Sequence, residues 1–283
     1  TKKHYLGYAI NRETSLPLWD GTTDNRWGHG KRVNKLYALF QTGSFWYLMG
    51  RYVGDGWKRN SDNGKGIVVC CSDRNRESLL DAIKTMGLNV TVSNERTVTK
   101  CTICSKELNE FVDRYGYYAH GKRIDAETMN LPADLLRRFV DGLIDSDGCY
   151  TNNEFKITTV SRELAYGIQQ CVAKVYRTHC KINKYVRPAK YTIEGREVNQ
   201  RDTYSVSWHT ERRKQDHAFY EDGYIWFPLS KIEMPNAIHT VYNIEVDTDT
   251  SYTANGAIVH NCQDFSNAGL QAGGDEGSGT RSG

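Results

Sequence analysis

The chain has 283 residues, a formal net charge of +3 and a mean hydropathy of −0.65, as expected of a soluble globular protein with one large domain or two small ones. No apolar run reaches the roughly 18 residues of a membrane-spanning helix, and no apolar signal-like stretch follows Thr1, so a cytoplasmic location is expected. The eight cysteines follow no disulfide pattern, and Cys101 and Cys104 lack a second zinc-type pair, so buried structural thiols are expected.

Residues 1–42 are rich in Gly, Asn, Asp and Trp and predict an irregular lead-in with one short strand near Tyr5–Ile10. A regular series of elements follows, with Ser105 as a candidate N-cap of its last helix. The series is a helix at 45–53, a strand at 67–72, a helix at 76–86, strands at 89–93 and 97–103, and a helix at 106–115.

The same order then returns. It comprises a helix at 135–145, a strand at 155–159, a helix at 162–177 headed by Ser161, and strands at 181–187 and 204–208 joined by the polar insertion 188–202. Short alternating strands at 241–247 and 251–260 follow, with Asn255-Gly256 as a hairpin turn. The glycine-rich stretch after Cys262 is not expected to build a core of its own.

Each half opens on a short, mostly apolar helix that ends in Asp-Gly, at Asp55-Gly56 and at Asp147-Gly148. Gly50 and Gly142 would let these two helices pack backbone to backbone, so the two carboxylates would meet at one point. Two carboxylates, with water and phosphate oxygens, suit Mg²⁺, which prefers hard oxygen ligands.

The segments Tyr47-Leu-Met-Gly-Arg-Tyr-Val-Gly-Asp-Gly56 and Asp141-Gly-Leu-Ile-Asp-Ser-Asp-Gly148 resemble the two motifs of the LAGLIDADG (dodecapeptide) homing endonucleases, in the form carried by inteins. The resemblance covers residues 43–230, as halves 43–130 and 131–230. It implies an α+β fold of two αββαββα-like halves whose saddle-shaped sheets straddle double-stranded DNA. It also implies a monomeric DNA endonuclease, with Asp55 and Asp147 as Mg²⁺ ligands and Asp145 as a support of the helix end.

Intein-borne members carry a lysine in a Lys-x-Ile-Pro-like segment before the second motif. Here Gly121-Lys-Arg-Ile-Asp125 stands at that place, with Asp125 instead of proline, so Lys122 is the first candidate for a catalytic cation. The symmetric lysine should follow the strand at 204–208, where Lys214 is the best candidate and Arg213 stays open. A solvated surface lysine is the alternative at both positions.

A basic block with interleaved tyrosines covers residues 174–214. It is either a solvated face or a phosphate-binding surface, and we predict DNA contacts there. The candidate residues are Lys181, Lys184, Arg187 and Lys190.

Val259-His260-Asn261-Cys262 resembles the C-terminal splice junction of an intein, and the strands before it resemble a conserved intein block. The resemblance implies a small all-β (Hint) remnant at 231–261. There the Asn261 side chain would cyclise with His260 as general acid, and the Cys262 thiol would accept the N-terminal flank. No N-terminal splicing block is recognised in residues 1–42, so splicing in cis is not expected of this chain alone, and a fragment or a split system is implied.

Cys262-Gln-Asp-Phe-Ser266 and the Arg281-Ser282 context resemble the catalytic loop of DNA (cytosine-5)-methyltransferases, which makes 262–283 the start of an interrupted host protein. The sequence therefore predicts an intein-embedded endonuclease that cuts the intein-free methyltransferase gene. One alternative is a catalytically degenerate DNA-binding intein remnant. The other treats the chain as the interrupted centre of a methyltransferase.

Overall fold

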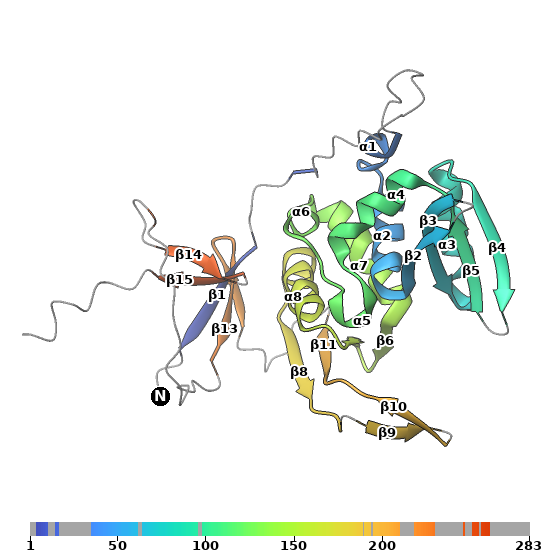
Figure 1. The fold of residues 1–283 in the computed structure, drawn as a ribbon. Helices are drawn as coiled ribbons and strands as arrows, with labels where there is room; N and C mark the ends of the chain where they lie inside the picture. Colours follow the sequence, from blue (N-terminus) through green and yellow to red (C-terminus); the bar gives the residue numbers. More distant parts are fainter. Residues whose placement is uncertain are drawn as a thin grey trace, which may run out of the picture.

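The computed structural model describes residues 4–10, 15–16, 35–61, 64–95, 98–188, 190–193, 195–209, 218–229, 246, 251–254 and 256–260. In this part of the chain, helices pack against antiparallel sheets in an α+β architecture (Figure 1). None of its helices is both long enough and apolar enough to cross a membrane.

The first half follows the short helix α1 (Lys35–Leu39) and forms a four-stranded sheet in the order β2-β3-β5-β4. Its elements are α2 (Gly43–Asp55), β2 (Gly56–Ser61), β3 (Gly64–Cys71), α3 (Asp73–Thr85), β4 (Val90–Glu95), β5 (Val98–Ile103), α4 (Lys106–Phe111) and the 3-10 helix η1 (Val112–Tyr115). The helices α5 (Tyr118–Gly121) and α6 (Ala126–Met129) lead to the second half.

The second half repeats this topology in the sheet order β6-β7-β11-β8. Its elements are α7 (Ala133–Asp147), β6 (Gly148–Thr151), β7 (Glu154–Thr159), α8 (Arg162–Tyr176), β8 (Cys180–Tyr185) and β11 (Thr203–His209). The halves differ between their last two strands, because β9 (Lys190–Ile193) and β10 (Arg196–Asn199) form an added hairpin that projects beyond the sheet (Figure 1).

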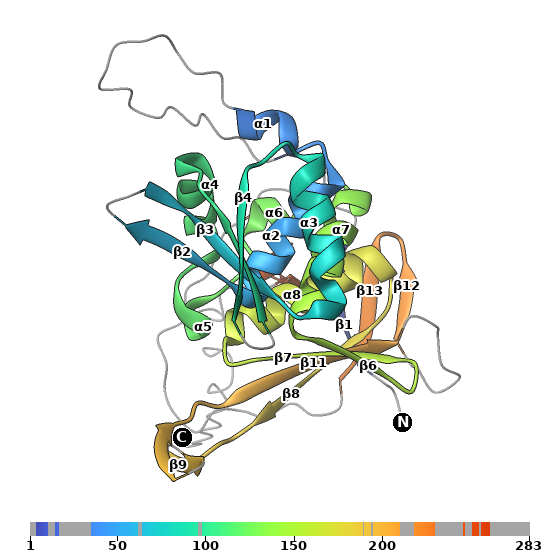
Figure 2. The ribbon, with the colours of Figure 1, turned by 90° about the vertical axis from the view of Figure 1, so that its right-hand side faces the viewer.

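The central contact of the fold is between α2 and α7, and one apolar core runs through both halves. Phe40, Phe45, Trp46 and Phe139 are fully buried in it. The Trp46 indole N–H donates to the Phe40 carbonyl at 2.7 Å, which satisfies the polar end of this buried ring. In Figure 2, α2, α3, α7 and α8 gather on the same side of the two four-stranded sheets, so the described helices cover one face of each sheet.

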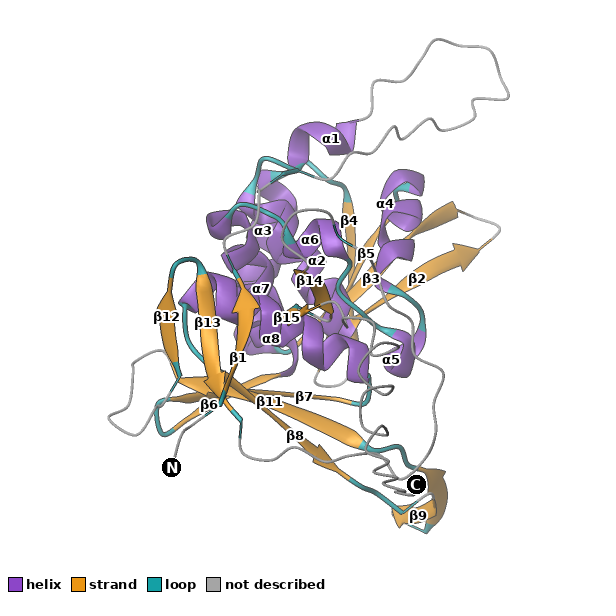
Figure 3. Cartoon of the chain, turned by 90° about the vertical axis from the view of Figure 1, so that its left-hand side faces the viewer, coloured by secondary structure: helices purple, strands orange, loops and turns teal. Residues whose placement is uncertain are grey.

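A third, five-stranded sheet has the order β12-β13-β1-β15-β14. It joins β1 (Tyr5–Ala9), β12 (Phe219–Glu221), β13 (Tyr224–Pro228), β14 (Ser251–Ala254) and β15 (Ala257–His260). Ile10 and Ile225 cluster with Ala173 of α8, which places this sheet against the second half. Figure 3 shows β1 beside β13 at the edge of the helical layer.

The elements expected within the described residues are present, including the hairpin at 251–260 and the serine caps. The Ser105 and Ser161 hydroxyls accept hydrogen bonds from the Leu108 and Leu164 amides at 3.1 Å. The structure adds β2, β6 and the β9–β10 hairpin, the last within the insertion 188–202. It also pairs β13, which the sequence analysis counted with the second half, with β1. The expected strand at 241–247 lies outside the described residues.

Candidate active site

The two motif helices approach each other at their glycines. A Cβ atom on Gly50 would lie 2.0 Å from the Phe139 carbonyl oxygen, and one on Gly142 would lie 2.2 Å from the Tyr47 carbonyl oxygen. No side-chain carbon fits at such distances, so the helices touch backbone to backbone as the sequence predicts. The contact continues to the helix ends, where a Cβ atom on Gly54 would lie 3.5 Å from Asp147 Oδ2.

This packing brings Asp55, the last residue of α2, and Asp147, the last residue of α7, into one electrostatic cluster. Burial, together with the smaller effect of the neighbouring Asp55 charge, raises the pKa of Asp147 to about 6. Burial also raises the pKa of Asp55, against the opposing effects of Arg51 and Lys122. Two like charges sharing a half-buried place resist ionisation together, and this makes the place favourable for a cation.

Lys122 reaches the same place from the loop after α5. Its Nζ donates to the carbonyls of Tyr52 at 2.9 Å and Gly56 at 3.0 Å, and it lies 3.9 Å from the centre of the Tyr52 ring. These carbonyls form the C-terminal end of α2, where the helix dipole favours a cation. The residue is only 7% exposed, so Lys122 is not a solvated surface lysine. Burial lowers its pKa to about 8, although Asp147 and Asp55 both favour the charged form.

The loop that carries Lys122 is fixed from both halves. The Arg123 amide donates to the Tyr115 carbonyl at 3.0 Å, and the Ser161 hydroxyl, which caps α8, donates to the Lys122 carbonyl at 2.6 Å. A single cap therefore orients the second-half helix and the backbone of the lysine.

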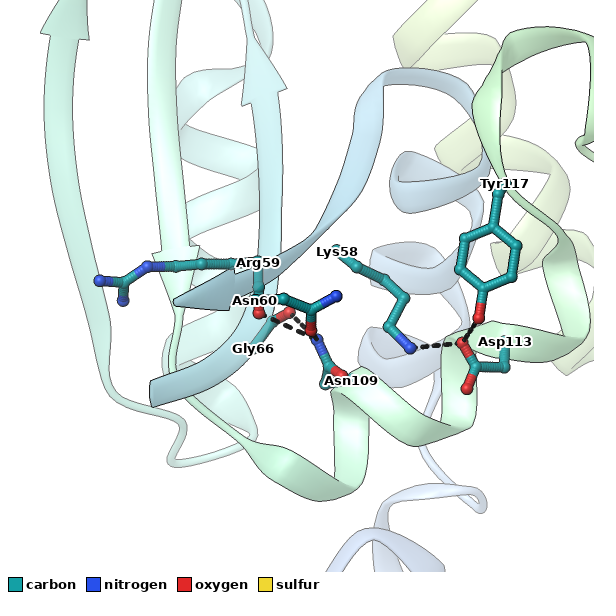
Figure 4. A network of polar contacts seen from close by, with 7 residues as sticks. All are labelled: Lys58, Arg59, Asn60, Gly66, Asn109, Asp113 and Tyr117. Atoms are coloured by element: carbon teal, nitrogen blue, oxygen red, sulfur yellow. Dashed lines mark hydrogen bonds and ion pairs between the residues drawn. The ribbon is translucent and has the colours of Figure 1, made fainter. Parts of the chain in front are cut away.

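A polar network next to this loop holds β2 against α4 and η1 (Figure 4). The Asn109 side-chain amide donates to the Gly66 carbonyl at 2.7 Å, within the β2–β3 pair, and to the Arg59 carbonyl at 3.1 Å. The Asp113 carboxylate accepts hydrogen bonds from Lys58 and from the Tyr117 hydroxyl. The middle of β2, from Lys58 to Asn60, is therefore anchored.

Arg51 is a further member of the site, and no sequence motif indicates it. It lies one turn before Asp55 on α2 and is 1% exposed, and its Nη2 donates to the Cys70 carbonyl of β3 at 2.7 Å. The guanidinium lowers the pKa values of both Asp55 and Asp147. The available signal was a lone charge in the middle of an otherwise apolar helix.

Asp145 is used differently from Asp147. Its Oδ2 accepts a hydrogen bond from the Tyr47 hydroxyl of α2 at 2.6 Å, and its carbonyl accepts one from the Asn75 side chain at the same distance. This carboxylate therefore bridges the two motif helices, as expected of a residue that supports the helix end.

The donor set at the helix ends suits a hard divalent cation that keeps water ligands. Two carboxylates converge there, and the described residues contain no group of three or more His, Cys, Asp or Glu side chains that could enclose a metal. Mg²⁺ is commonly held by one or two carboxylates together with waters and substrate phosphates. Asp55 and Asp147 therefore fit this ion.

The predicted DNA-contacting residues lie on or beside β8 and β9 and are exposed. Cross-strand register aligns Lys181 with Ser207, in a row that faces away from the core, whereas Lys184 aligns with Tyr204, which packs against the core. Lys184 pairs with Asp202 at 2.8 Å, and Lys190 pairs with Glu197 at 2.7 Å. The Arg187 amide donates to the Asp202 carboxylate at 3.2 Å.

His260 is the last residue of β15, opposite Ser251 of β14. Lys214, Asn261 and Cys262 lie outside the described residues, as does Arg213. The two carboxylates and Lys122 are thus brought together, and the second lysine and the splice residues after His260 stay predictions.

Residues 134–206, within the second half of the chain, match the family model described as a LAGLIDADG-like domain. A stretch of 155 residues is 30% identical to an iron-sulfur cluster assembly SufBD family protein of Mycobacterium tuberculosis, over 53% of this chain and 18% of that protein. A stretch of 250 residues is 28% identical to a DNA polymerase of Thermococcus sp. (strain GE8), over 78% of this chain and 15% of that protein. The chain thus spans less than a fifth of either curated relative.

Two solved structures are distantly similar. The crystal structure of I-DmoI in complex with DNA and Mn matches with a TM-score of 0.41 at 14% identity, over 58% of this chain and 88% of that chain. The N-terminal LAGLIDADG domain of DUF199/WhiA matches with a TM-score of 0.37 at 14% identity, over 58% of this chain and 74% of that chain.

Proposed function

We propose that the chain is a Mg²⁺-dependent, site-specific endonuclease that cuts double-stranded DNA as a monomer. The observation that carries the proposal is the meeting of Asp55 and Asp147 at the ends of a glycine-packed helix pair, with Lys122 buried beside them. The LAGLIDADG-like match covers one half, and the other half repeats its topology. Each half thus contributes one carboxylate, as a duplex with two scissile strands requires.

The roles of the residues follow from their chemistry. Asp55 and Asp147 would hold the ion, and a divalent ion held there would supply water activation and stabilisation of the leaving oxygen of a phosphodiester. Lys122 keeps a cation next to the reacting phosphate in a water-poor setting, where it stabilises negative charge more strongly than in water. Lys214, or its neighbour Arg213, would supply the matching cation of the second half. Lys181, Lys184, Arg187 and Lys190 would contact the DNA backbone.

We further infer that this endonuclease is carried by an intein. A SufBD family protein and a DNA polymerase have unrelated activities, yet the chain matches a small part of each, as an element inserted into different hosts would. The hairpin β14–β15 ends at His260, directly before Asn261 and Cys262. The Asn261 side-chain nitrogen would attack its own backbone carbonyl carbon, forming a succinimide. The bond to Cys262 would break, and His260 would protonate the leaving amine.

The host, on the motif that starts at Cys262, is a DNA (cytosine-5)-methyltransferase. The DNA target is then the same gene without the insertion. A cytoplasmic location accords with these roles and stays part of the proposal.

A plasmid-cleavage assay tests the endonuclease. The substrate carries the uninterrupted methyltransferase sequence, and Asp147→Asn is the matched control. Mg²⁺-dependent linearisation by the wild type, lost in the variant, is the expected result. Binding of the plasmid without cutting by both proteins would instead identify a degenerate DNA-binding remnant.

A further inference from the structure

The Arg51 guanidinium is a buried positive charge with few hydrogen-bond partners. Its side chain is almost fully buried, and of its three guanidinium nitrogens only Nη2 has a hydrogen-bond partner among the described residues. Nε and Nη1 are buried and unpaired there. A buried guanidinium without enough partners is strongly unfavourable unless opposite charge lies close by.

The opposite charge comes from both motif helices. Asp55 lies one turn further along α2, Asp147 comes from α7, and Arg51 acts electrostatically on both. The other groups that interact with Arg51 are the Tyr47 hydroxyl and the Cys71 thiol, which are neutral at pH 7, while Lys122 is the second cation at the carboxylates. The Arg51 carbonyl also accepts a hydrogen bond from the Ser146 hydroxyl at 3.3 Å, so its backbone is tied to the partner helix.

We propose that Arg51 is the internal counter-cation of the carboxylate pair, a positioning residue that keeps Asp55 and Asp147 compatible with folding before a divalent ion is bound. Its bond to the Cys70 carbonyl fixes the guanidinium on the β3 side of α2, where it acts on both carboxylates through space without a direct ion pair among the described residues. Arginine suits this role because it stays charged under all ordinary conditions, whereas a buried lysine can lose its proton. The inference concerns the metal site of the proposed endonuclease and so rests on that function, but its test needs neither DNA nor cleavage.

The test is a double-mutant cycle on the metal-free full chain. Arg51→Met removes the charge with little change in length, and it should lower Tm by about 5 °C in the wild-type background. In an Asp147→Asn background the same substitution should cost less than half as much, because the carboxylate that needed compensation has gone. Equal losses in the two backgrounds would overturn the proposal, since they would show that Arg51 matters only for packing and for its bond to Cys70.

Two further measurements complete the test. Arg51→Lys keeps the charge but not the planar guanidinium, and it should retain most of the stability that Arg51→Met loses. A fall in Tm as large as that of Arg51→Met, or failure of Arg51→Lys to fold, would count against charge compensation. If Arg51→Met itself does not fold, Arg51→Lys is the deciding variant. Addition of 10 mM Ca²⁺ should raise Tm more in Arg51→Met than in wild type, and an equal rise would contradict the proposal.

Arg114→Met is the matched control. Arg114 pairs with Asp125 at 3.3 Å and with Glu127 at 2.9 Å. The fall in Tm that Arg114→Met causes should therefore be the same with or without Ca²⁺, and with or without Asp147→Asn. A dependence as large as that of Arg51 would show that the coupling is not specific to the site, and would overturn the assignment.

Discussion

Gly50 of α2 and Gly142 of α7 lie against each other so closely that a Cβ atom on Gly142 would be 3.1 Å from the Gly50 Cα. The contact sets where the two helices end relative to each other. Asp55 follows Gly50 by five residues and Asp147 follows Gly142 by five, so equal lengths of helix carry the two carboxylates to one place. The chemistry of the site thus depends on two positions that carry no functional group.

Gly50→Ala should therefore destabilise the fold by roughly 2–3 kcal/mol or more, because the added methyl group meets the Phe139 backbone, which cannot move aside like a flexible side chain. Urea denaturation measures the change. Gly121→Ala is the control, since nothing lies within 4 Å of a Cβ atom there, and it should alter stability by less than about 1 kcal/mol. Similar losses in both variants would mean that the helices are not in backbone contact.

The helix–strand repeat and the glycine contact could be predicted because they depend on local signals, namely apolar periodicity, serine caps and the recurring Asp-Gly. The strands β2 and β6 gave no such signal. Their polar residues become strand only by pairing with β3 and β7. Arg51 was missed for a related reason, because its burial depends on α7, about 90 residues further along the chain. The segment around Lys122 resembles a family motif, and this resemblance indicated the residue. Its burial depends on tertiary contacts that the neighbouring sequence does not reveal.

The buried lysine predicts a specific pH dependence of stability. The pKa of Lys122 is lowered from 10.5 to about 8 in the fold, so unfolding takes up a proton between these values. The contribution of Lys122 to stability is then present above pH 10.5 and is lost as the pH falls through 8. The stability of the wild type relative to Lys122→Met should therefore rise by roughly 2–3 kcal/mol from pH 7 to pH 10, measured by urea denaturation without DNA. A constant difference would indicate that the lysine ionises normally.

Tyr118 adopts a left-handed backbone conformation with φ of 56°, which residues other than glycine rarely adopt, and its side chain is 80% exposed. Tyr118→Gly should therefore be more stable than Tyr118→Ala by about 1 kcal/mol. Tyr117, with φ of −119°, is the control, and there the alanine variant should be the more stable of the two. Thermal unfolding of the four variants checks the reversal, and the same order at both positions would refute the left-handed conformation of Tyr118.

The register of the second sheet makes Lys181 and Lys184 a matched pair for testing the proposed DNA surface. Lys181 shares the outward row of Ser207 and has no carboxylate partner among the described residues, whereas Lys184 shares the row of Tyr204 and is paired with Asp202. Lys181→Ala should therefore weaken DNA binding several-fold and reduce the slope of log K against log salt by about 1, as expected when one phosphate contact is lost. Lys184→Ala should change the DNA affinity and the salt slope less, because the Lys184 charge is already paired with Asp202. Fluorescence anisotropy over a series of salt concentrations separates the two, and a larger effect at Lys184 would place the DNA on the other row of β8.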